Sequence, residues 1–484
     1  MALTAADITR LNPWWADPTW AAHDPHLPAI PAAVTLPDPT FVSGIALGDR
    51  SVHVVRGPRQ VGKSTGLKRL VDRALADGAA PSQVVYLSLD LLEGASSAAF
   101  ATVVRRAKEL AASDGPSLIL LDEVTVVPRW ARAVKDLWDA GDIRNDTVVC
   151  TGSSAIDLAD GEVESLPGRR GAGSDFLVLP QSFASVARAA DPLIPASPSL
   201  RIGALFTPEG RETLRQAQKH LPRLGVALDR YLVFGGLPAA VVEAASGAAR
   251  PSAATQRVLW DSISREVRRR GASEPALRAL LERVVLGLSS KTSWSTLARE
   301  MDTPLGGKNA RVPPDGKTVK DYIEFLGRNY VLLVAYFWKA SLATNDQAHD
   351  KKIYLGDPLL HTIVLDRTPG LAFDKAKAVE NAVALALYRT YEPEANKAEG
   401  FAYPQELHAW ETTKPREIDF VCGRRPAAEL VEVKYQSRAG AGDTLVMRNA
   451  FPGRPAVLAT RETFALEDAY LMLPAELLLW VVGG

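Results

Sequence analysis

The chain has 484 residues, of which 47% are hydrophobic and 23% are charged, and its 56 basic residues are matched by 56 acidic residues. This composition indicates a globular protein of roughly three domains and excludes a disordered chain, a collagen-like repeat and a coiled-coil rod. A net charge of zero also excludes a protein that coats nucleic acid through its overall basic charge. Any contact with nucleic acid must therefore be local.

The chain shows no pattern typical of secreted or membrane proteins. Its two cysteines, Cys150 and Cys422, are too few for a disulfide framework and lie among apolar residues. Residues 1–15 lack the charged start and apolar core of a signal peptide. No run approaches the roughly 18 apolar residues that a membrane span requires. We therefore expect a cytoplasmic protein without membrane contact, and we expect the apolar run at 477–482 to be a buried strand.

The first elements predicted along the chain alternate between strands and helices. Residues 1–45 are rich in proline and tryptophan and are expected to form an irregular lead-in that packs on the next domain. After this segment, short apolar strands are predicted at 52–55, 84–89, 118–121 and 147–151, and helices at 64–76, 100–112 and 130–140. This alternation predicts an α/β domain with a parallel sheet covered on both faces.

The strongest single motif lies between the first strand and the first helix. It reads Gly57-Pro58-Arg59-Gln60-Val61-Gly62-Lys63-Ser64-Thr65 and fits the pattern G-x-x-x-x-G-K-[ST] in full. Such a loop wraps phosphates with its backbone N–H groups, and the helix N-terminus favours anions. Lys63 would contact the β- and γ-phosphates, and the Ser64 hydroxyl would hold Mg²⁺. The alternative is a glycine-rich turn without a ligand, but the strand–helix context favours a nucleotide site.

A pair of acids ends the strand predicted at 118–121. Asp122 is expected to bind the metal, and Glu123 is expected to polarise the attacking water. Kinases of small metabolites usually lack this second acid, so Glu123 favours hydrolysis of ATP over transfer of its phosphate.

Two further groups are candidates for the same sheet edge. Thr151 and Ser153 follow the strand at 147–151, where ligands of parallel sheets bind, so either hydroxyl is a candidate γ-phosphate sensor or a helix cap. Arg169 and Arg170 are candidates for an arginine donated to ATP in a neighbouring subunit, or for a solvated basic loop. An arginine acting in trans predicts a homo-oligomer.

These motifs resemble the AAA+-type ATPases of the archaeal-ATPase group. The resemblance rests on GPRQVGKST, LILLDE, TGSSA, the Pro180-Gln181-Ser182-Phe183 segment and the segment at 231–238, which is similar to the helical lid of that family. It implies a lead-in at 1–45, a P-loop AAA+-like core at 46–200 and a helical lid at 201–255. It also implies ATP and Mg²⁺ as ligands.

A winged-helix-like domain is predicted at 256–345. Helical spacing after Trp294 and from Thr318, followed by the apolar strand 331–335, is typical of a helix-turn-helix with a wing, a fold that either binds DNA or packs between domains. Two basic stretches, 257–270 and 303–320, are the predicted DNA contacts. A solvated helix end is the alternative explanation for the run Arg268 to Arg270.

A C-terminal domain is predicted at 346–484. Asp419 lies in one strand, and Glu432 and Lys434 share one face of the next, because strand side chains alternate. This arrangement resembles the PD-(D/E)xK restriction-nuclease core, with Glu380 as a further acid. The three acids would be metal ligands and Lys434 would orient water. Alternating charge on an exposed strand is the other explanation, and members of such folds also bind DNA without cutting it.

These observations predict an ATP-hydrolysing AAA+-like protein that acts on branched or broken DNA, with a C-terminal domain that resembles a metal-dependent nuclease. The alternative is a nucleotide-dependent switch or scaffold whose C-terminal domain only binds partners or DNA.

Overall fold

The structure is a computed structural model that describes residues 3–27, 34–92, 94–152, 175–301, 314–338, 350–392, 400–411, 416–423, 427–436 and 438–484. The chain divides into two compact units. Unit 1 spans Met1–Ile30 and Pro37–Leu179, and unit 2 spans Pro31–Leu36 and Pro180–Gly484. Among the described residues, no helix combines the length and the apolar character needed to cross a membrane.

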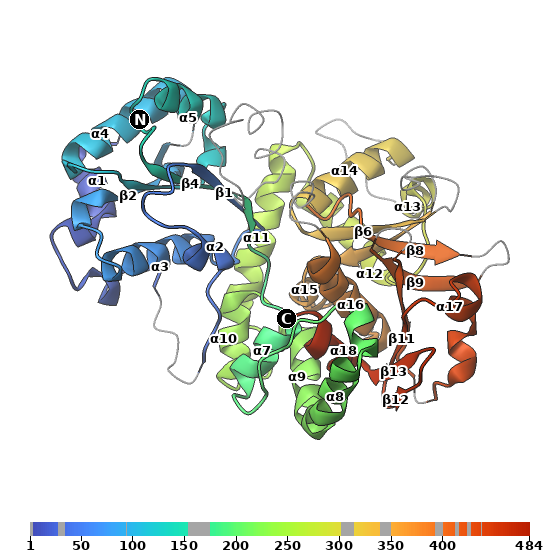
Figure 1. Ribbon diagram of the computed structural model, residues 1–484. Coiled ribbons are helices and arrows are strands. Elements are labelled where there is room, and N and C mark those ends of the chain that lie inside the picture. Colours follow the sequence, from blue (N-terminus) through green and yellow to red (C-terminus); the bar gives the residue numbers. More distant parts are fainter. Residues whose placement is uncertain are drawn as a thin grey trace. The chain divides into compact units, whose positions relative to one another are not determined.

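Unit 1 is built around a five-stranded sheet with the order β2-β3-β4-β1-β5, in which every recorded pairing is parallel. Its strands are β1 (Val52–Arg56), β2 (Val84–Ser88), β3 (Leu118–Asp122), β4 (Thr147–Thr151) and β5 (Asp175–Leu177). Its helices are α1 (Ala5–Leu11), α2 (Thr40–Gly44), α3 (Lys63–Ala76), α4 (Ser97–Ala111) and α5 (Trp130–Asp139). Figure 1 shows α3 on one face of this sheet and α4 and α5 on the other.

The parallel sheet predicted from the sequence is confirmed, and each of its four predicted strands forms. Continuous burial of these strands explains their unbroken apolar runs, because helices cover both faces. The short edge strand β5 was not predicted from the sequence. It has only three residues and is half-buried, so it carries no apolar run.

The lead-in covers the edge strand β2. The Asn12 side chain donates to the carbonyl of Tyr86 at 2.9 Å and accepts from its N–H at 2.6 Å, as a neighbouring strand would. The indoles of Trp14 and Trp15 both donate to the carbonyl of Val84, at 3.0 and 2.9 Å. These contacts satisfy backbone groups that an uncovered edge would leave open.

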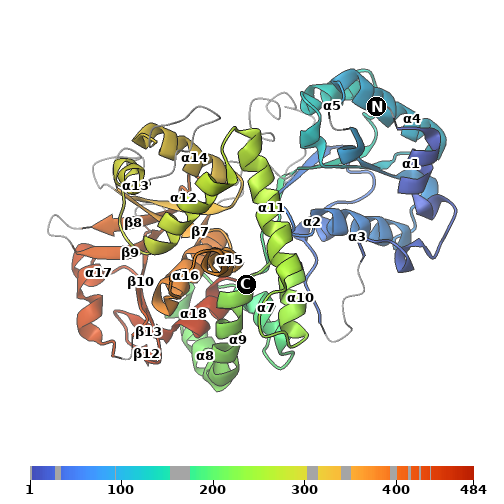
Figure 2. The ribbon, with the colours of Figure 1, turned by 180° about the vertical axis from the view of Figure 1, so that it is seen from behind.

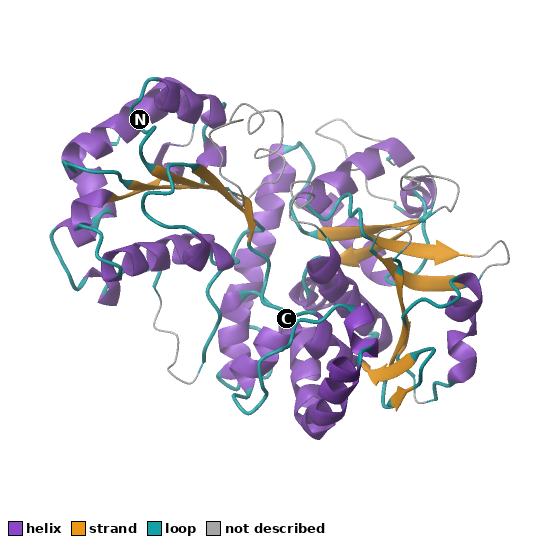
Figure 3. Ribbon diagram, in the orientation of Figure 1, coloured by secondary structure: helices purple, strands orange, loops and turns teal. Residues whose placement is uncertain are grey.

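Unit 2 combines helices with an eight-stranded mixed sheet of the order β12-β13-β11-β10-β9-β8-β6-β7 (Figure 3). Its strands are β6 (Leu332–Phe337), β7 (Lys351–Leu355), β8 (Leu407–Glu411), β9 (Glu417–Cys422), β10 (Glu429–Lys434), β11 (Ala456–Thr460), β12 (Ala465–Leu466) and β13 (Leu471–Pro474). Its helices are α7 (Phe183–Ala190), α8 (Pro208–Ala217), α9 (Leu221–Phe234), α10 (Pro238–Ala245), α11 (Ala253–Arg269), α12 (Glu274–Leu286), α13 (Trp294–Glu300), α14 (Gly316–Arg328), α15 (Pro358–Arg367), α16 (Lys375–Tyr391), α17 (Leu445–Ala450) and α18 (Ala475–Val482).

The winged helix predicted at 256–345 is not confirmed. Helices α13 and α14 do pack on each other (Figure 2). The strand that follows them, β6, does not form a separate wing, because it pairs with β7 and β8 inside the large sheet. The predicted domain boundary between residues 345 and 346 therefore falls between two paired strands of one sheet.

The apolar run at 477–482 is helical and not the strand predicted from the sequence. It belongs to α18, whose residues are buried on nearly every side. A helix buried all around has no polar face, so its sequence carries no 3.6-residue period that would distinguish it from a buried strand.

Candidate functional site

The loop Gly57–Gly62 has the backbone geometry of a phosphate-binding turn. Gly57 has φ of 147°, and a Cβ there would lie 2.0 Å from the carbonyl oxygen of Val178. Gly62 has φ of 93° and no side chain that caps α3, which begins at Lys63. Only glycine combines this conformation with such close backbone approach. The uncapped N-terminus of α3 leaves N–H groups directed toward the loop.

Lys63 lies at the start of α3 with its side chain turned back over the loop. Its ammonium donates to the carbonyl oxygens of Gly57 and Pro58, each at 2.8 Å. Burial lowers the pKa of Lys63, and the charges of Glu123 and Asp122 oppose that shift. The Lys63 ammonium is thus held by the loop carbonyls, and it interacts electrostatically with Glu123 and Asp122.

Asp122 is buried at the end of β3 and accepts two hydroxyl hydrogen bonds. Oδ2 accepts from the Tyr86 hydroxyl at 2.9 Å, and Oδ1 accepts from the Thr151 hydroxyl. The Thr151 oxygen in turn accepts from the N–H of Glu123 at 3.0 Å. Thr151 therefore bonds the carboxylate of Asp122 and the backbone of Glu123. Its assignment as a phosphate sensor stays a prediction.

Glu123 follows β3 with φ of 56°, in the left-handed region that a glutamate seldom adopts. Its Oε2 is buried and has no hydrogen-bond partner among the described residues. Burial raises the pKa of Glu123, Lys63 lowers it, and the neighbouring Asp122 raises it further. A water molecule or a cation could supply the partner that this buried carboxylate oxygen lacks. The site therefore fits Mg²⁺ and an attacking water.

The sequence pattern did not single out Tyr86 and Lys68. Lys68 on α3 is buried, with its ammonium 3.9 Å from the centre of the Tyr86 ring, 4.7 Å from that of Trp14 and 3.4 Å from an oxygen of Asp24. Tyr86 is thereby held between the lead-in and Asp122. Neither residue belongs to a motif, because both contacts depend on how α3, β2 and the lead-in pack.

For the other predicted residues of this site, the structure gives a position in the loop or helix, or they lie outside the described residues. Ser64 and Thr65 lie half-buried in the first turn of α3. Arg59, Gln60 and Val61 belong to the loop, where Gln60 has φ of 68°. The predicted candidates Ser153, Arg169 and Arg170 lie outside the described residues.

Two of the family-like segments meet each other in unit 2. The N–H of Gln181 donates to the carbonyl of Gly236 at 2.6 Å, and the N–H of Gly236 donates to Asp357 at 2.9 Å. The Arg389 guanidinium donates to the carbonyl of Pro180. A Cβ at Gly235 would collide with Asp357 at 1.8 Å, so this glycine is required for the turn. These motifs therefore have a structural role in joining α7, α9 and α15.

The acids predicted in the C-terminal region do come together. Asp419 on β9, Glu432 on β10 and Glu380 on α16 are each less than a tenth exposed. The N–H of Asp419 donates to Glu432 Oε2 at 3.1 Å, and the ammonium of Lys434 lies 2.8 Å from Glu432 Oε1. A cation that was not predicted, Lys352 on β7, lies 2.6 Å from Asp419 Oδ1 and 3.4 Å from Glu380 Oε1. We call these five residues the carboxylate cluster.

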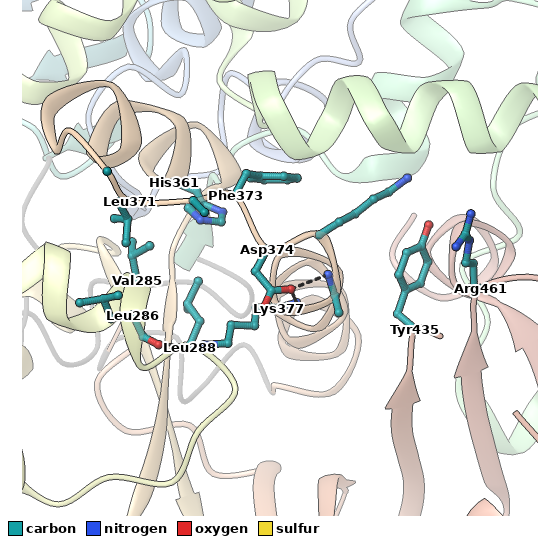
Figure 4. A pocket seen from close by; sticks show the side chains of 14 residues that line it. Val285, Leu286, Leu288, His361, Leu371, Phe373, Asp374, Lys377, Tyr435 and Arg461 are labelled. Carbon is teal, nitrogen blue, oxygen red and sulfur yellow. Dashed lines mark hydrogen bonds between the residues drawn. The ribbon is translucent and has the colours of Figure 1, made fainter. Parts of the chain in front are cut away.

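A cavity of about 710 Å³ opens at the start of α16. Figure 4 shows Tyr435 and Arg461 on one side of it, and Val285, Leu286 and Leu371 on the other. Tyr435 directly follows Lys434 on β10, and the lining residue Lys377 lies one helical turn before Glu380.

The predicted DNA-contact stretch 257–270 covers most of α11 and its C-cap residue Arg270, and its exposed arginines form what we call the arginine face. Its five arginines are exposed: Arg257, Arg265, Arg268, Arg269 and Arg270. The Arg270 guanidinium lies 4.7 Å from the ring centre of Phe325 on α14. In the second stretch, 303–320, residues 302–313 lie outside the described residues, and Lys320 lies 3.4 Å from Glu324.

Comparison with known protein families finds matches to two parts of the chain. Residues 49–187 match a family described as "AAA domain", and residues 226–369 match a domain of unknown function. The second match extends across the boundaries predicted at 255 and 345. No curated protein matches the chain.

Several solved structures are similar to the chain at low scores. The ORC2 protein of Aeropyrum pernix is 12% identical over 68% of this chain and 91% of its own, with a TM-score of 0.34. The ORC1 protein of the same organism, solved in complex with DNA, is 12% identical over 65% and 86%, with a TM-score of 0.26. A RuvB mutant of Thermotoga maritima is 13% identical over 51% and 73%, with a TM-score of 0.23. Scores of this size do not establish a shared overall fold.

The assignment therefore depends on unit 1 itself. A complete phosphate-binding loop follows β1, an acidic pair ends β3, and the strands form a five-stranded parallel sheet. The family match covers these same elements. Residues 49–187 therefore match an AAA domain and contain a complete P-loop in a parallel sheet.

Proposed function

We propose that this protein hydrolyses ATP and uses the reaction to act on DNA. The observation that carries the hydrolytic part is the buried Oε2 of Glu123, which has no donor within the described part of the chain and is affected by the charges of Lys63 and Asp122. A carboxylate in this state is poised to accept a proton from a water molecule. Its raised pKa strengthens it as a base, because a stronger base accepts the proton more readily.

Each residue of the loop has a distinct role in this proposal. The N–H groups of residues 57–65 bind the phosphates, and Lys63 exchanges its contacts with loop carbonyls for contacts with the β- and γ-phosphates. Ser64 and Asp122 are the residues that would hold Mg²⁺, whose charge stabilises the transferred phosphoryl group. Tyr86 and Thr151 hold the carboxylate of Asp122 in one orientation, because each donates to a different oxygen.

We propose that DNA contacts unit 2 through the arginine face of α11 and the basic residues at 303–320. Exposed arginines bind phosphates in a salt-dependent way without requiring a particular sequence. The pocket at the start of α16, whose lining includes Lys375, Lys377 and Arg461, is a further candidate contact. Tyr435 in the same lining offers an aromatic ring on which a base of single-stranded DNA can stack.

The experiment that tests this function measures ATP turnover by the full chain with duplex, forked and single-stranded DNA at low and physiological salt. We expect DNA to stimulate turnover and binding to weaken with salt. Unchanged turnover with all three DNA forms, together with no binding at low salt, would overturn action on DNA. That result would favour a nucleotide-dependent switch or scaffold.

We further propose a homo-oligomer in which Arg169 or Arg170 contacts the ATP of a neighbour. In such an assembly, a subunit without these arginines can still hydrolyse ATP when its neighbour supplies them. The test mixes R169A/R170A subunits with K63A subunits and measures the recovered turnover. Turnover that stays at the level of the separate variants would contradict an arginine acting in trans.

A further inference from the structure

In the carboxylate cluster of unit 2, protein donors already satisfy the acids. Asp419 Oδ1 lies 2.6 Å from the ammonium of Lys352, and its Oδ2 accepts from the N–H of Val433 at 2.8 Å. Glu432 Oε1 contacts the ammonium of Lys434 at 2.8 Å, and Oε2 accepts from the N–H of Asp419 at 3.1 Å. These carboxylates could bind a metal ion only if the ion displaced the donors that they contact now.

Lys352 is the central cation of the cluster. Its side chain is 1% exposed, and its ammonium also lies 3.4 Å from an oxygen of Glu380 and 3.4 Å from one of Glu417. Glu380 accepts a further hydrogen bond of 2.8 Å from the Tyr354 hydroxyl. A buried charge is retained only when it is paired, and Lys352 has three carboxylates around it. Its position is the one that a bridging cation between Asp419 and Glu380 would take.

A divalent ion between Asp419 and Glu380 would have to displace the Lys352 ammonium or lie within a few Å of it. Two positive charges within about 4 Å repel each other by several kcal/mol at the effective dielectric constant of a protein surface, and by more in a buried site. In agreement with this, the described residues contain no group of three or more acids, histidines and cysteines arranged to hold a metal ion. The Mg²⁺ that the nuclease-like pattern implies therefore does not fit the residues as they stand.

We infer that Lys352 is the resident cation of the carboxylate cluster and replaces the divalent metal of a nuclease-like site. The cluster joins β7, β9, β10 and α16 as a structural ion-pair network. If unit 2 contacts DNA as proposed above, it does so without metal-dependent cleavage at Asp419, Glu432 and Lys434, and this consequence rests on that proposed function. The inference concerns unit 2 alone and does not require the proposed ATP hydrolysis.

The test compares Mn²⁺ binding to the full chain without nucleotide, measured by electron paramagnetic resonance of free Mn²⁺. The proteins are the parent, K352M, D419N and K352M/D419N. Methionine keeps the length and packing of the lysine stem and removes its charge. We expect the parent and D419N to bind Mn²⁺ equally weakly. We expect K352M to bind at least about tenfold more tightly, and K352M/D419N to lose that gain.

The outcome that overturns the inference is Mn²⁺ binding by the parent that D419N abolishes, since an ion would then displace Lys352 from Asp419. Binding to K352M that stays as weak as in the parent also overturns it. If K352M does not fold, the comparison of parent with D419N still decides between a metal and Lys352. A cleavage assay with Mn²⁺ on labelled forked DNA provides a second readout, with no D419N-sensitive product expected from the parent. Neither readout depends on ATP turnover, so the proposed ATPase function can fail without affecting the result.

Discussion

The Tyr86 hydroxyl donates a hydrogen bond of 2.9 Å to Oδ2 of Asp122, the acid that we assign to the metal of the nucleotide site. Tyr86 also connects to the lead-in, because its backbone N–H and carbonyl are both bonded to the Asn12 side chain. The orientation of Asp122 thus depends on a strand that the lead-in covers. This relationship makes Tyr86 a positioning residue, since it acts on the site only through Asp122.

The first prediction concerns this tyrosine. Y86F removes one hydrogen bond to a charged carboxylate, which is worth about 1.5–3 kcal/mol. We expect the Mg²⁺ concentration for half-maximal ATP turnover to rise by about tenfold, while turnover at saturating Mg²⁺ changes less. A Mg²⁺ titration of turnover measures this, with Y322F on α14 as the matched control. An unchanged Mg²⁺ requirement would show that Asp122 does not depend on Tyr86.

The second prediction separates nucleotide binding from hydrolysis. K63A removes the cation of the loop and should lose both ATP affinity and turnover. E123Q keeps the shape of the side chain without a basic oxygen, so it should bind ATP but hydrolyse it about 10²–10⁴-fold more slowly. Equilibrium binding of labelled ATP and phosphate release measure the two effects, with R132A on the exposed side of α5 as control. Retained turnover in K63A would contradict the assignment of unit 1.

Glu123 also gives a third prediction, on pH. As the proposed base, Glu123 must be deprotonated to work, and burial raises its pKa. Turnover should therefore fall as the pH drops through this raised pKa, at a higher pH than an ordinary glutamate would produce. A pH profile of turnover at saturating ATP measures it. If turnover by E123Q falls over the same pH range and with the same steepness as in the parent, a group other than Glu123 causes the fall.

The fourth prediction concerns the arginine face of α11. R265A/R268A/R269A removes three exposed cations, and the slope of log affinity against log salt should become shallower by about 0.9 for each phosphate that is no longer neutralised. We expect weaker DNA binding at every sequence tested. Fluorescence anisotropy across a salt series measures the slope. The control, R215A/R278A, removes arginines from α8 and α12. If that variant binds DNA equally weakly, the overall positive charge of the chain and not the arginine face binds DNA.

The fifth prediction concerns His361 on α15, which is buried against Phe373 and near Asp374 and Lys377. Burial lowers its pKa from 6.5 to about 4, so the folded state favours the neutral ring. Its contribution to stability is full above pH 6.5 and is lost as the pH falls toward 4, by up to about 3 kcal/mol. H361Q should flatten the fall in unfolding free energy between these pH values, as measured by urea denaturation.

The control for this prediction is internal to the chain. His408 on β8 has its pKa lowered to about 4 by burial as well, so H361Q alone should remove only part of the pH dependence. The double variant H361Q/H408Q should remove more. A pH dependence that stays unchanged in both variants would assign acid sensitivity to the carboxylates.

How much the sequence predicts differs between the two units. In unit 1 the elements from β1 to β4 follow directly from apolar runs and from the glycines of the loop, because a sheet covered on both faces needs unbroken apolar strands. The acidic pair Asp122 and Glu123 was likewise visible, since metal and water chemistry requires those residue types at that strand end. Thr151 was also a candidate from the sequence, but the sequence did not predict its hydrogen bonds with the Asp122 carboxylate and the Glu123 backbone N–H.

In unit 2 local patterns were less informative. The spacing of Glu432 and Lys434 correctly predicts that they share a strand face, because side chains alternate along a strand. The apolar run at 477–482 carried no period, and the strand β6 gave no sign that it joins the large sheet instead of a wing. Both the helix at 477–482 and the pairing of β6 depend on how these segments pack against distant parts of the chain.

The sequence by itself therefore determined the nucleotide-binding chemistry, because a phosphate loop requires particular residues at fixed spacings within one short segment. Zero net charge excluded coating of nucleic acid, and the arginines of α11 show how a neutral chain still gathers a local basic face. Only the tertiary structure placed Tyr86 on Asp122 and Lys352 on Asp419, residues 36 and 67 positions apart in the chain. Contacts over such separations leave no periodic signal, since they arise when distant elements pack together and buried charges must find partners.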